Sequence, residues 1–347
     1  MSDRTVSLES VLLRAWTRRG WLACLLWPLS LLFGAVVLWR RAAYRCGWKK
    51  AERLPVPLVV VGNIFVGGTG KTPLTIWLVE ALRCAGYRPG VISRGYGAAA
   101  QGTLAVTTAS QAQQVGDEPL LIAERAACPV VVGRSRVAAG LALLAQYPEV
   151  NVIVSDDGLQ HYALARDVEI VLSDQRGVGN GWLLPAGPLR EPAWRRGDFA
   201  VCNLGSRDPH ASADLPVATV AMWLEAGYAE QLQDRTRRVP LATLADSAQT
   251  LVAAAGIGNP ERFFATLQGA GLGFERLALP DHYDFSDNPF AGLQAEMILI
   301  TEKDAVKCRA IEAIKSDPRI WVVPVTARID GALAEQIVEK LHERPTA

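Results

Sequence analysis

The stretch Val-Val-Val-Gly-Asn-Ile-Phe-Val-Gly-Gly-Thr-Gly-Lys-Thr-Pro, residues 59–73, decides the fold of this 347-residue chain. An apolar run followed by a glycine-rich turn and a helix start is typical of a strand, a phosphate-binding loop and a helix. Glycines let backbone N–H groups turn toward phosphate oxygens, and the dipole of the helix adds to the attraction. We therefore predict a nucleoside triphosphate site at this loop.

The residues that end the loop are those expected to act on the nucleotide. Lys71 should reach the β- and γ-phosphates, and the Thr72 hydroxyl should reach Mg²⁺. One residue departs from the strict G-x-x-x-x-G-K-[ST] pattern, because Phe65 stands where that pattern has glycine. The predicted cofactor-binding residues are Phe65, Val66, Gly67, Gly68, Thr69, Gly70, Lys71 and Thr72.

Short apolar runs alternate with helical stretches after residue 57, which indicates a doubly wound α/β sheet. The predicted strands are Leu58–Val61, Val130–Val132, Val152–Val154, Glu169–Leu172, Phe199–Cys202, Thr250–Ala255, Met297–Thr301 and Trp321–Val325. Helices are expected over Pro73–Ala85, Ser135–Gln146 and Asp330–Glu343. We expect N-terminal membrane-associated helices over 1–50, a nucleotide-binding domain over 51–215, an extended linker over 216–240 and a smaller α/β domain over 241–347.

The N-terminus is apolar and flanked by basic residues. Apolar residues at helical spacing over 8–16, with arginines nearby, indicate an amphipathic helix at a membrane surface. Trp21–Trp39 contains no charged residue and is long enough for a helix that nearly matches a bilayer core of about 30 Å. A cleaved signal peptide, a buried core helix and, because of Pro28, a kinked helix in one leaflet are the alternatives. We expect a membrane anchor, and the basic cluster after it favours the cytoplasmic side for the rest of the chain.

The overall composition excludes some classes of function. The formal net charge is +1, so the chain as a whole gives no case for binding nucleic acid. The six cysteines are scattered and form no C-x-x-C pair, which argues against a zinc site and against a disulfide framework.

Two carboxylates end one of the predicted buried strands. Asp156 and Asp157 follow the run Val152–Val154, and ligands of such sheets bind at the carboxyl ends of strands. We predict that one of the two holds Mg²⁺, directly or through water; the alternative is a solvated acidic turn. Gln160 and His161 lie next to this turn.

Two further motifs supply candidates for proton transfer. Asp117 and Glu118 precede a proline, and a carboxylate suits the acceptor of a hydroxyl proton in phosphoryl transfer. The same pattern equally predicts the start of a helix. His282 lies between acidic residues that can orient it, although a surface-loop histidine is the simpler interpretation.

Arginines on predicted loops are candidates for holding an anionic substrate, because a guanidinium binds phosphate in a bidentate manner. Each is equally explained as a solvated charge or an ion-pair partner. They are Arg94, Arg134, Arg136 and Arg190.

These pieces, in this order, resemble the tetraacyldisaccharide 4′-kinase family, the lipid A 4′-kinases of Gram-negative bacteria. The resemblance extends from the apolar N-terminus to about Lys307 and includes the unusual residue at Phe65. The motifs are G-N-I-F-V-G-G-T-G-K-T-P, S-R-G-Y-G, G-D-E-P, S-D-D-G-L-Q-H, L-P-A-G-P-L-R-E-P, D-H-Y-D-F and T-E-K-D-A-V-K.

The resemblance implies a P-loop NTPase-like three-layer α/β/α domain, a smaller α/β/α domain and an active site in the cleft between them. It implies transfer of the ATP γ-phosphate, with Mg²⁺, to the 4′-hydroxyl of an acylated glucosamine disaccharide 1-phosphate. An enzyme of this kind acts at the bacterial inner membrane with its catalytic domains on the cytoplasmic side. Nothing in the sequence indicates an obligate protein partner.

The resemblance also carries roles onto individual residues. Asp117 matches the catalytic base and His282 its partner; Lys71 and Thr72 match the phosphate and Mg²⁺ positions. Asp156 and Asp157 match the acidic pair beside the metal. The expected substrate-site residues are Arg94, Glu118, Arg134, Arg136, Gln160, His161, Arg190 and Glu191.

Three other functions share parts of this pattern. A membrane-associated ATPase of the MinD type uses a similar loop, but usually has a lysine where Val66 stands and lacks the G-D-E-P and D-H-Y-D-F motifs. A non-enzymatic nucleotide sensor would not need Asp117. A soluble small-molecule kinase would use the apolar N-terminus as core.

Overall fold

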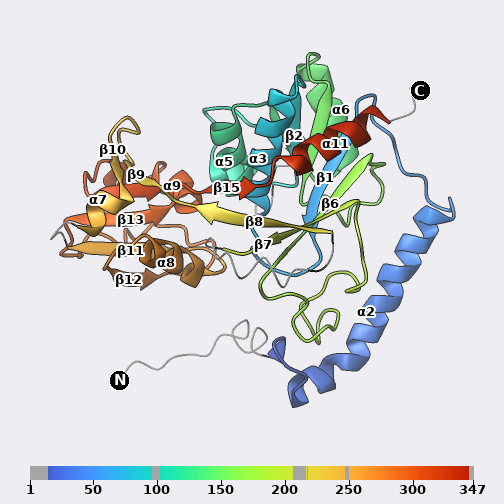
Figure 1. Ribbon diagram of the computed structural model, residues 1–347, viewed down its shortest axis with the longest axis horizontal. Coiled ribbons are helices and arrows are strands. Elements are labelled where there is room, and N and C mark those ends of the chain that lie inside the picture. The colour runs from blue at the N-terminus through green and yellow to red at the C-terminus, as the bar shows by residue number, and fades with distance from the viewer. Residues whose placement is uncertain (1–14, 96–101, 206–215, 217, 247–249, 344–347) are drawn as a thin grey trace.

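The structure is a computed structural model that describes residues 15–95, 102–205, 216, 218–246 and 250–343. Two β-sheets lie side by side, and a long N-terminal helix runs along the larger domain (Figure 1). The predicted α/β class is confirmed.

The larger sheet has nine strands in the order β15-β8-β7-β6-β1-β5-β2-β4-β3. Strands β8 to β4 in this order are parallel, and β15 and β3 pair antiparallel at the two edges. The central strands are buried on both faces, which explains their uninterrupted apolar sequences. The strands are β1 (Leu58–Asn63), β2 (Pro89–Ser93), β3 (Thr103–Ala105), β4 (Val130–Gly133), β5 (Val152–Asp156), β6 (Val168–Asp174), β7 (Phe199–Asn203), β8 (Thr219–Glu225) and β15 (Thr326–Ile329).

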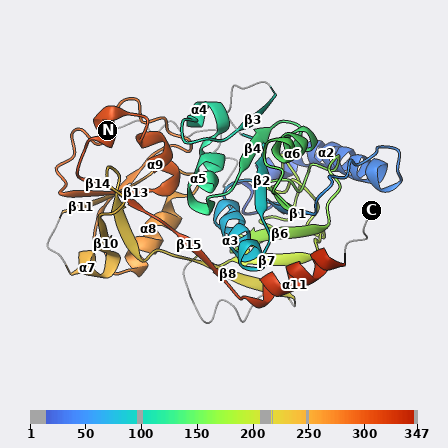
Figure 2. The same cartoon turned by 90° about the horizontal axis from the view of Figure 1, so that it is seen from above.

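Helices cover the two faces of this sheet unequally (Figure 2). One face packs against α3 (Lys71–Cys84), α5 (Asp117–Ala126) and α11 (Ala332–His342), with the short α4 (Ala112–Val115) beside α5. The other face packs against α6 (Arg136–Gln146) and against loop residues such as Leu159 and Leu189. The second face is therefore covered partly by loops, whereas the first face is covered by helices.

The smaller sheet has six strands in the order β10-β9-β14-β13-β11-β12. They are β9 (Tyr228–Gln231), β10 (Arg238–Pro240), β11 (Leu251–Ala255), β12 (Glu275–Ala278), β13 (Met297–Thr301) and β14 (Ile320–Val323). Its helices are α7 (Leu241–Ala245), α8 (Pro260–Gly269), α9 (Glu302–Cys308) and α10 (Glu312–Lys315). Residues of α7 and α8 share one apolar cluster with the sheet, and residues of α9 and α10 share the other.

The expected domain boundaries need two corrections. Residues 216–240 are not an extended linker, because β8 lies in the larger sheet while β9 and β10 lie in the smaller one. Residues 326–343 do not belong to the second domain, because β15 pairs with β8 and α11 packs on α3. Strand β8 contains the apolar run Val220–Leu224, but within it only Met222 is buried, unlike the fully buried central strands.

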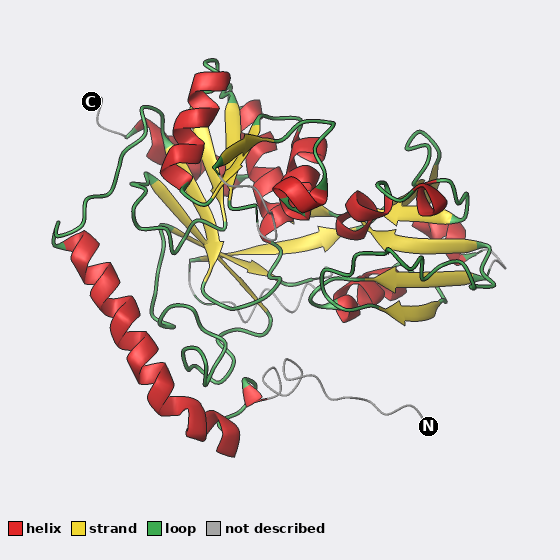
Figure 3. Cartoon of the chain, turned by 180° about the vertical axis from the view of Figure 1, so that it is seen from behind, coloured by secondary structure: helices red, strands yellow, loops and turns green. Residues whose placement is uncertain are grey.

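Two neighbouring chain segments join the domains. One connects β8 to β9 and the other connects β14 to β15, and the strands on both sides of the crossing pair antiparallel. The connection is thus a two-stranded ribbon, seen in Figure 3 as a long strand running from one sheet toward the other.

The predicted apolar N-terminal helix is α2 (Trp21–Arg45), which continues past Trp39 and contains Pro28. By length and composition it is the one helix among the described residues that is able to cross a membrane. The amphipathic helix expected over 8–16 lies almost entirely outside the described residues.

One face of α2 contacts the loop before Arg190. The Ser30 hydroxyl donates to the Leu183 carbonyl at 2.8 Å and accepts from the Ala186 N–H at 2.9 Å. Gly34 lies so close that a Cβ there would be 2.9 Å from the Leu183 side chain. The helix is therefore bonded to the larger domain at its middle.

Candidate active site

The carboxyl ends of three neighbouring strands meet around the phosphate-binding loop. Strand β1 lies between β5 and β6, so Asn63, Asp156 and Asp174 end neighbouring strands on the same edge of the sheet. The chain leaves β1 into the loop and α3 at this position. Ligands of open α/β sheets bind at such a point.

Side chains of the strand ends hold the loop in shape. Asn203 donates from Nδ2 to the Thr69 carbonyl at 2.9 Å, and Asn63 donates from Nδ2 to the Thr69 hydroxyl at 2.9 Å. Gly70 has φ +99°, and a Cβ there would lie 2.4 Å from Asn203 Nδ2. Only glycine fits this position without strain.

Phe65, which departs from the strict loop pattern, is a structural residue. Its ring is 7 % exposed and lies 4.3 Å from the centre of the Arg176 guanidinium. Its backbone bridges to Leu189, and the next N–H, of Val66, donates to the Pro188 carbonyl at 2.9 Å. The first half of the loop is therefore held by neighbouring chain and does not need a glycine at this position.

Lys71 lies in the first turn of α3 beside Asp157. Its Nζ is 3.6 Å from Asp157 Oδ1 and donates to Asn63 Oδ1 at 3.4 Å. Arg190 donates to the same carboxylate at 3.2 Å. Burial alone would raise the pKa of Asp157, but Lys71 and Arg190 outweigh it and the pKa is lowered. Asp157 is therefore ionised at neutral pH.

Asp156 is fully buried behind this pair. It accepts hydrogen bonds from the Thr75 hydroxyl at 3.1 Å and from the Ser93 hydroxyl at 3.4 Å. Burial, followed by the negative charges of Glu118 and Asp157, raises the pKa of Asp156 to about 7. A cation bound here would lower the pKa of Asp156 again, since a nearby opposite charge favours the ionised form.

The donor set suits Mg²⁺, which prefers oxygen ligands and is usually bound by one or two carboxylates together with substrate phosphates. The Thr72 hydroxyl, Asp156 and Asp157 offer hard oxygen atoms beside the loop. The described residues contain no group of three or more His, Cys, Asp or Glu arranged to hold a metal alone.

A second cluster surrounds Asp117, the first residue of α5. Asp117 Oδ2 lies 3.3 Å from His282 Nδ1, 3.4 Å from Lys307 Nζ and 3.8 Å from Lys303 Nζ. Burial opposes ionisation, but the two lysines and His282 outweigh it, so the pKa of Asp117 is lowered. The motif does begin a helix, with Asp117 as its first residue and Gly116 as the N-cap, and the role of Asp117 as proton acceptor stays a prediction.

Lys303 and Lys307 were not singled out from the sequence, although they lie in the quoted motif T-E-K-D-A-V-K. Their spacing places both on one face of α9. Lys303 Nζ also contacts Glu118 Oε1 at 3.3 Å, so Glu118 is tied to the second domain in this structure. The sequence signal for them is the i,i+4 spacing of the two lysines, which puts two positive charges on one helix face.

Two residues expected to bind substrate have mainly internal partners. Arg136 is 3 % exposed and donates to the carbonyls of Asp156 at 3.1 Å and Asp157 at 3.4 Å. Glu191 is 1 % exposed and accepts from Gln160 at 3.0 Å, Tyr162 at 2.6 Å and Arg195 at 3.2 Å. Both shape the site from behind.

The other expected substrate residues lie nearer the surface. Arg94 and Arg134 are exposed just after β2 and β4. Gln160 donates to the Asn63 carbonyl at 3.1 Å, which links the acidic turn to the start of the phosphate loop. Burial, followed by Arg136 and other arginines, lowers the pKa of His161 to about 4, so this imidazole is neutral at pH 7.

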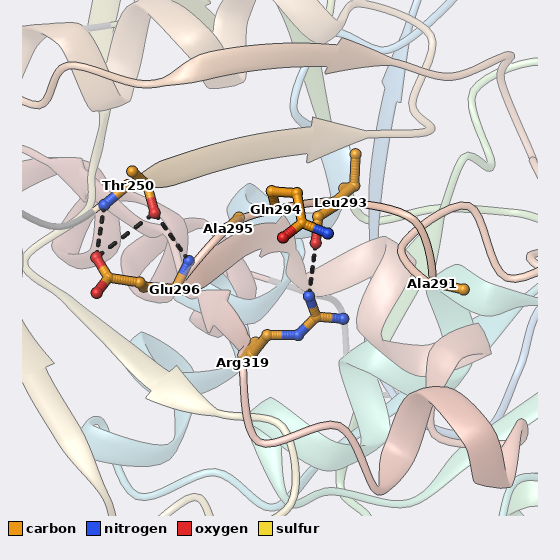
Figure 4. A pocket seen from close by; sticks show the side chains of 7 residues that line it. All are labelled: Thr250, Ala291, Leu293, Gln294, Ala295, Glu296 and Arg319. Carbon is orange, nitrogen blue, oxygen red and sulfur yellow. Dashed lines mark hydrogen bonds between the residues drawn. The ribbon is translucent and has the colours of Figure 1, made fainter.

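A hollow of about 310 Å³ lies elsewhere, on the second domain (Figure 4). Its polar groups are bonded to one another: Glu296 accepts from the Thr250 N–H at 2.9 Å, and Arg319 donates to the Leu293 carbonyl at 2.8 Å. None of the expected site residues lines it. We assign it no role in the chemistry.

Comparison with known proteins decides the family. The family model for Tetraacyldisaccharide-1-P 4'-kinase (LpxK) matches residues 22–342. The chain belongs to this family. The match covers both domains and most of α2.

Relatives of the family match over nearly the whole chain. The tetraacyldisaccharide 4'-kinase of Janthinobacterium sp. (strain Marseille) is 63% identical over 351 residues, covering 100% of both chains. The enzyme of Herminiimonas arsenicoxydans is 59% identical over 97% of this chain and 96% of its own. A solved structure of LpxK from Aquifex aeolicus, titled as an "apo" form in complex with ATP, has a TM-score of 0.76 at 30% identity, covering 92% of this chain and 99% of that one.

Proposed function

We propose that this chain is an ATP-dependent kinase of lipid A biosynthesis that phosphorylates the 4′-hydroxyl of a tetraacyl glucosamine disaccharide 1-phosphate. One observation carries the proposal. The pair Asp117–His282 joins the two domains at the first residue of α5, and α5 packs against α3, the helix that begins with Lys71. The proton acceptor and the phosphate-binding loop therefore belong to two helices in contact with each other.

The nucleotide occupies the loop in this proposal. Backbone N–H groups of residues 67–72 and Lys71 hold the β- and γ-phosphates. Thr72 and the pair Asp156 and Asp157 hold Mg²⁺, which when bound offsets the charge that develops on the transferred phosphoryl group. Arg190, which pairs with Asp157, adds positive charge at the same place.

Asp117 accepts the proton of the attacking hydroxyl. Its lowered pKa keeps the carboxylate ionised, although it also makes Asp117 a weaker base. Phosphoryl transfer tolerates this, because its loose transition state asks mainly for alignment and charge neutralisation. His282, whose Nδ1 lies 3.3 Å from Asp117 Oδ2, orients the carboxylate.

Arginines at the strand ends are proposed to hold the anionic head group of the acceptor. Arg190 donates to Asp157 beside the phosphate-binding loop and directly follows the loop that contacts α2. Arg94 and Arg134 are exposed and available for phosphate contacts.

We propose that α2 lies in the inner membrane with the catalytic domains on the cytoplasmic side. The face turned away from the protein is apolar: Trp21 is 80 % exposed and Leu25 and Leu32 are each 67 % exposed. Arg40 and Arg41 near its end supply the positive charge expected on the cytoplasmic side. The acyl chains of the acceptor remain in the bilayer while its head group reaches the site.

A partner-stimulated ATPase of the MinD type is not favoured. Val66 occupies the position of the lysine that such proteins usually carry before the glycines, and family membership covers the whole site.

The test uses γ-labelled ATP and a lipid A disaccharide precursor in mixed micelles, with full-length protein. Wild type should place label in the lipid, whereas Asp117→Ala and Lys71→Ala should not. Arg276→Ala, on an exposed strand of the second domain, is the matched control and should label the lipid normally. ATP hydrolysis by the wild type without labelled lipid would overturn the proposal.

A further inference from the structure

The second domain contacts the phosphate-binding loop at a place away from Asp117. Arg262 projects from the first turns of α8 and reaches the larger domain. Its NH1 group donates to the Gly68 carbonyl at 3.1 Å, and its NH2 group lies 2.7 Å from Asp174 Oδ2. A residue of the second domain thus bonds to the backbone of the loop.

Asp174 is the buried centre of this contact. Its side chain is 1 % exposed and is shared by two arginines, Arg262 and Arg176. Arg176 also donates to the Gly68 carbonyl, at 3.2 Å, and covers the Phe65 ring. The Gly68 carbonyl therefore accepts from two guanidinium groups, and only one of them comes from the same domain as the loop.

The direction of this carbonyl determines the direction of an N–H group of the loop. In a trans peptide the C=O and N–H point opposite ways, so the bonds to the Gly68 carbonyl turn the Thr69 N–H away from the arginines. Gly68 has no side chain that restricts rotation of this peptide. The space around its Cα is also open, because a Cβ there would meet nothing within 4 Å. The two arginines supply the restraint that the glycine lacks.

We infer that Arg262 is a positioning residue of the nucleotide site, which fixes the Gly68–Thr69 peptide for phosphate binding only when the second domain is docked on the first. The inference rests on the proposed nucleotide site at this loop and adds a coupling to it. Because coupling is reciprocal, a bound nucleotide must favour docking of the second domain by the same factor. Docking in turn brings His282 to Asp117, so ATP binding and assembly of the proton-accepting pair are linked.

The first test measures ATP affinity of the full-length protein by equilibrium binding of a fluorescent ATP analogue. Arg262→Ala should weaken binding about tenfold, within the usual range for coupled sites. Arg262→Lys should recover part of the loss, because an ammonium group bonds to Asp174 or to Gly68 but lacks the fork that reaches both. Arg276→Ala is the control: its side chain is 43 % exposed and pairs with Glu261 at 3.0 Å.

Steady-state kinetics separate positioning from general damage. Arg262→Ala should raise KM for ATP and leave KM for the lipid acceptor unchanged. The inference would be overturned if KM rose equally for ATP and for the lipid acceptor. It would also be overturned if Arg276→Ala raised KM for ATP as much as Arg262→Ala does.

The coupling itself is tested by hydrogen exchange at residues 281–285. ATP at saturating concentration should slow exchange there in wild type and much less in Arg262→Ala. Full ATP-induced protection in the variant would overturn the coupling.

Lys71→Ala distinguishes the inference from the proposed function. If this variant loses the analogue while Arg262→Ala binds normally, the nucleotide site stands and the inference fails. If Lys71→Ala also binds normally, the proposed site itself is wrong.

Discussion

His282 Nδ1 lies 3.3 Å from Asp117 Oδ2, although the two residues belong to different domains. Lys303 and Lys307 approach the same carboxylate from α9, also in the second domain. The first domain therefore supplies the carboxylate, and the second domain supplies the groups that orient it and keep it charged.

This division predicts strong and non-additive effects of substitution. Asp117→Ala should lower kcat by about 10²- to 10⁴-fold, the usual contribution of a positioned base, with ATP binding nearly unchanged. His282→Ala should lower kcat less, and the double variant should be little worse than Asp117→Ala, because the pair acts as a unit. If the two losses in kcat multiplied in the double variant, the residues would not act as a pair. His342→Ala is the matched control.

Glu191 is predicted to stabilise the fold, in contrast to its expected role in substrate binding. Its carboxylate is buried with Gln160, Tyr162 and Arg195. Glu191→Ala leaves the Gln160 amide and the Tyr162 hydroxyl without their acceptor and Arg195 with Glu169 alone, so it should cost about 1–3 kcal/mol of unfolding free energy. Thermal unfolding of this variant and of Glu312→Ala, an exposed control, measures the difference. A Glu191→Ala protein of normal stability with a raised KM for lipid would show that the carboxylate binds substrate instead.

The lowered pKa of His161 makes the stability of the fold depend on pH. Burial and nearby arginines lower the pKa of His161 from 6.5 to about 4, so the unfolded chain binds more protons between these values. Its contribution is therefore complete above pH 6.5 and is lost as the pH falls toward 4. His161→Gln should show a smaller drop in Tm than wild type between pH 7.5 and pH 5. An equal drop in both proteins would assign the pH dependence to other groups.

The bonds of Ser30 predict that helix α2 supports the loop before Arg190. Ser30→Ala removes a donor for the Leu183 carbonyl and an acceptor for the Ala186 N–H, at a cost of about 1–3 kcal/mol. Hydrogen exchange over residues 183–189 should become faster, and KM for the lipid acceptor should rise. Leu32→Ala, on the exposed face, should weaken membrane binding without changing exchange in this loop. Unchanged hydrogen exchange over residues 183–189 in Ser30→Ala would show that α2 does not support this loop.

Local patterns predicted the features that short segments determine by themselves. The loop before Lys71, the strand ending at Asp156 and the helix beginning at Asp117 all follow from neighbouring residues. The place of Phe65 required the family resemblance, because its support comes from Leu189 and Arg176, which are distant in the chain.

Features that depend on how distant segments meet could not be predicted. Arg262 and Asp174 are ordinary charged residues until the domains dock. The burial of Arg136 was equally hidden, since its main partners are backbone carbonyls, which leave no mark in the sequence. The edge strand β15 carries only a weak apolar pattern, so the sequence does not indicate that the chain returns to the first sheet.

That return has a consequence for how the protein is made. Strand β15 and helix α11 complete the first domain, and Leu333, Ile337 and Leu341 of α11 are buried in its core. Both elements follow the whole second domain in the chain and therefore emerge from the ribosome after it. The nucleotide-binding domain therefore cannot finish folding during synthesis in the usual order of N-terminal domain first. Until then β8 remains an open edge and α3 lacks the packing of α11, so the first domain is completed only after the second domain has been synthesised.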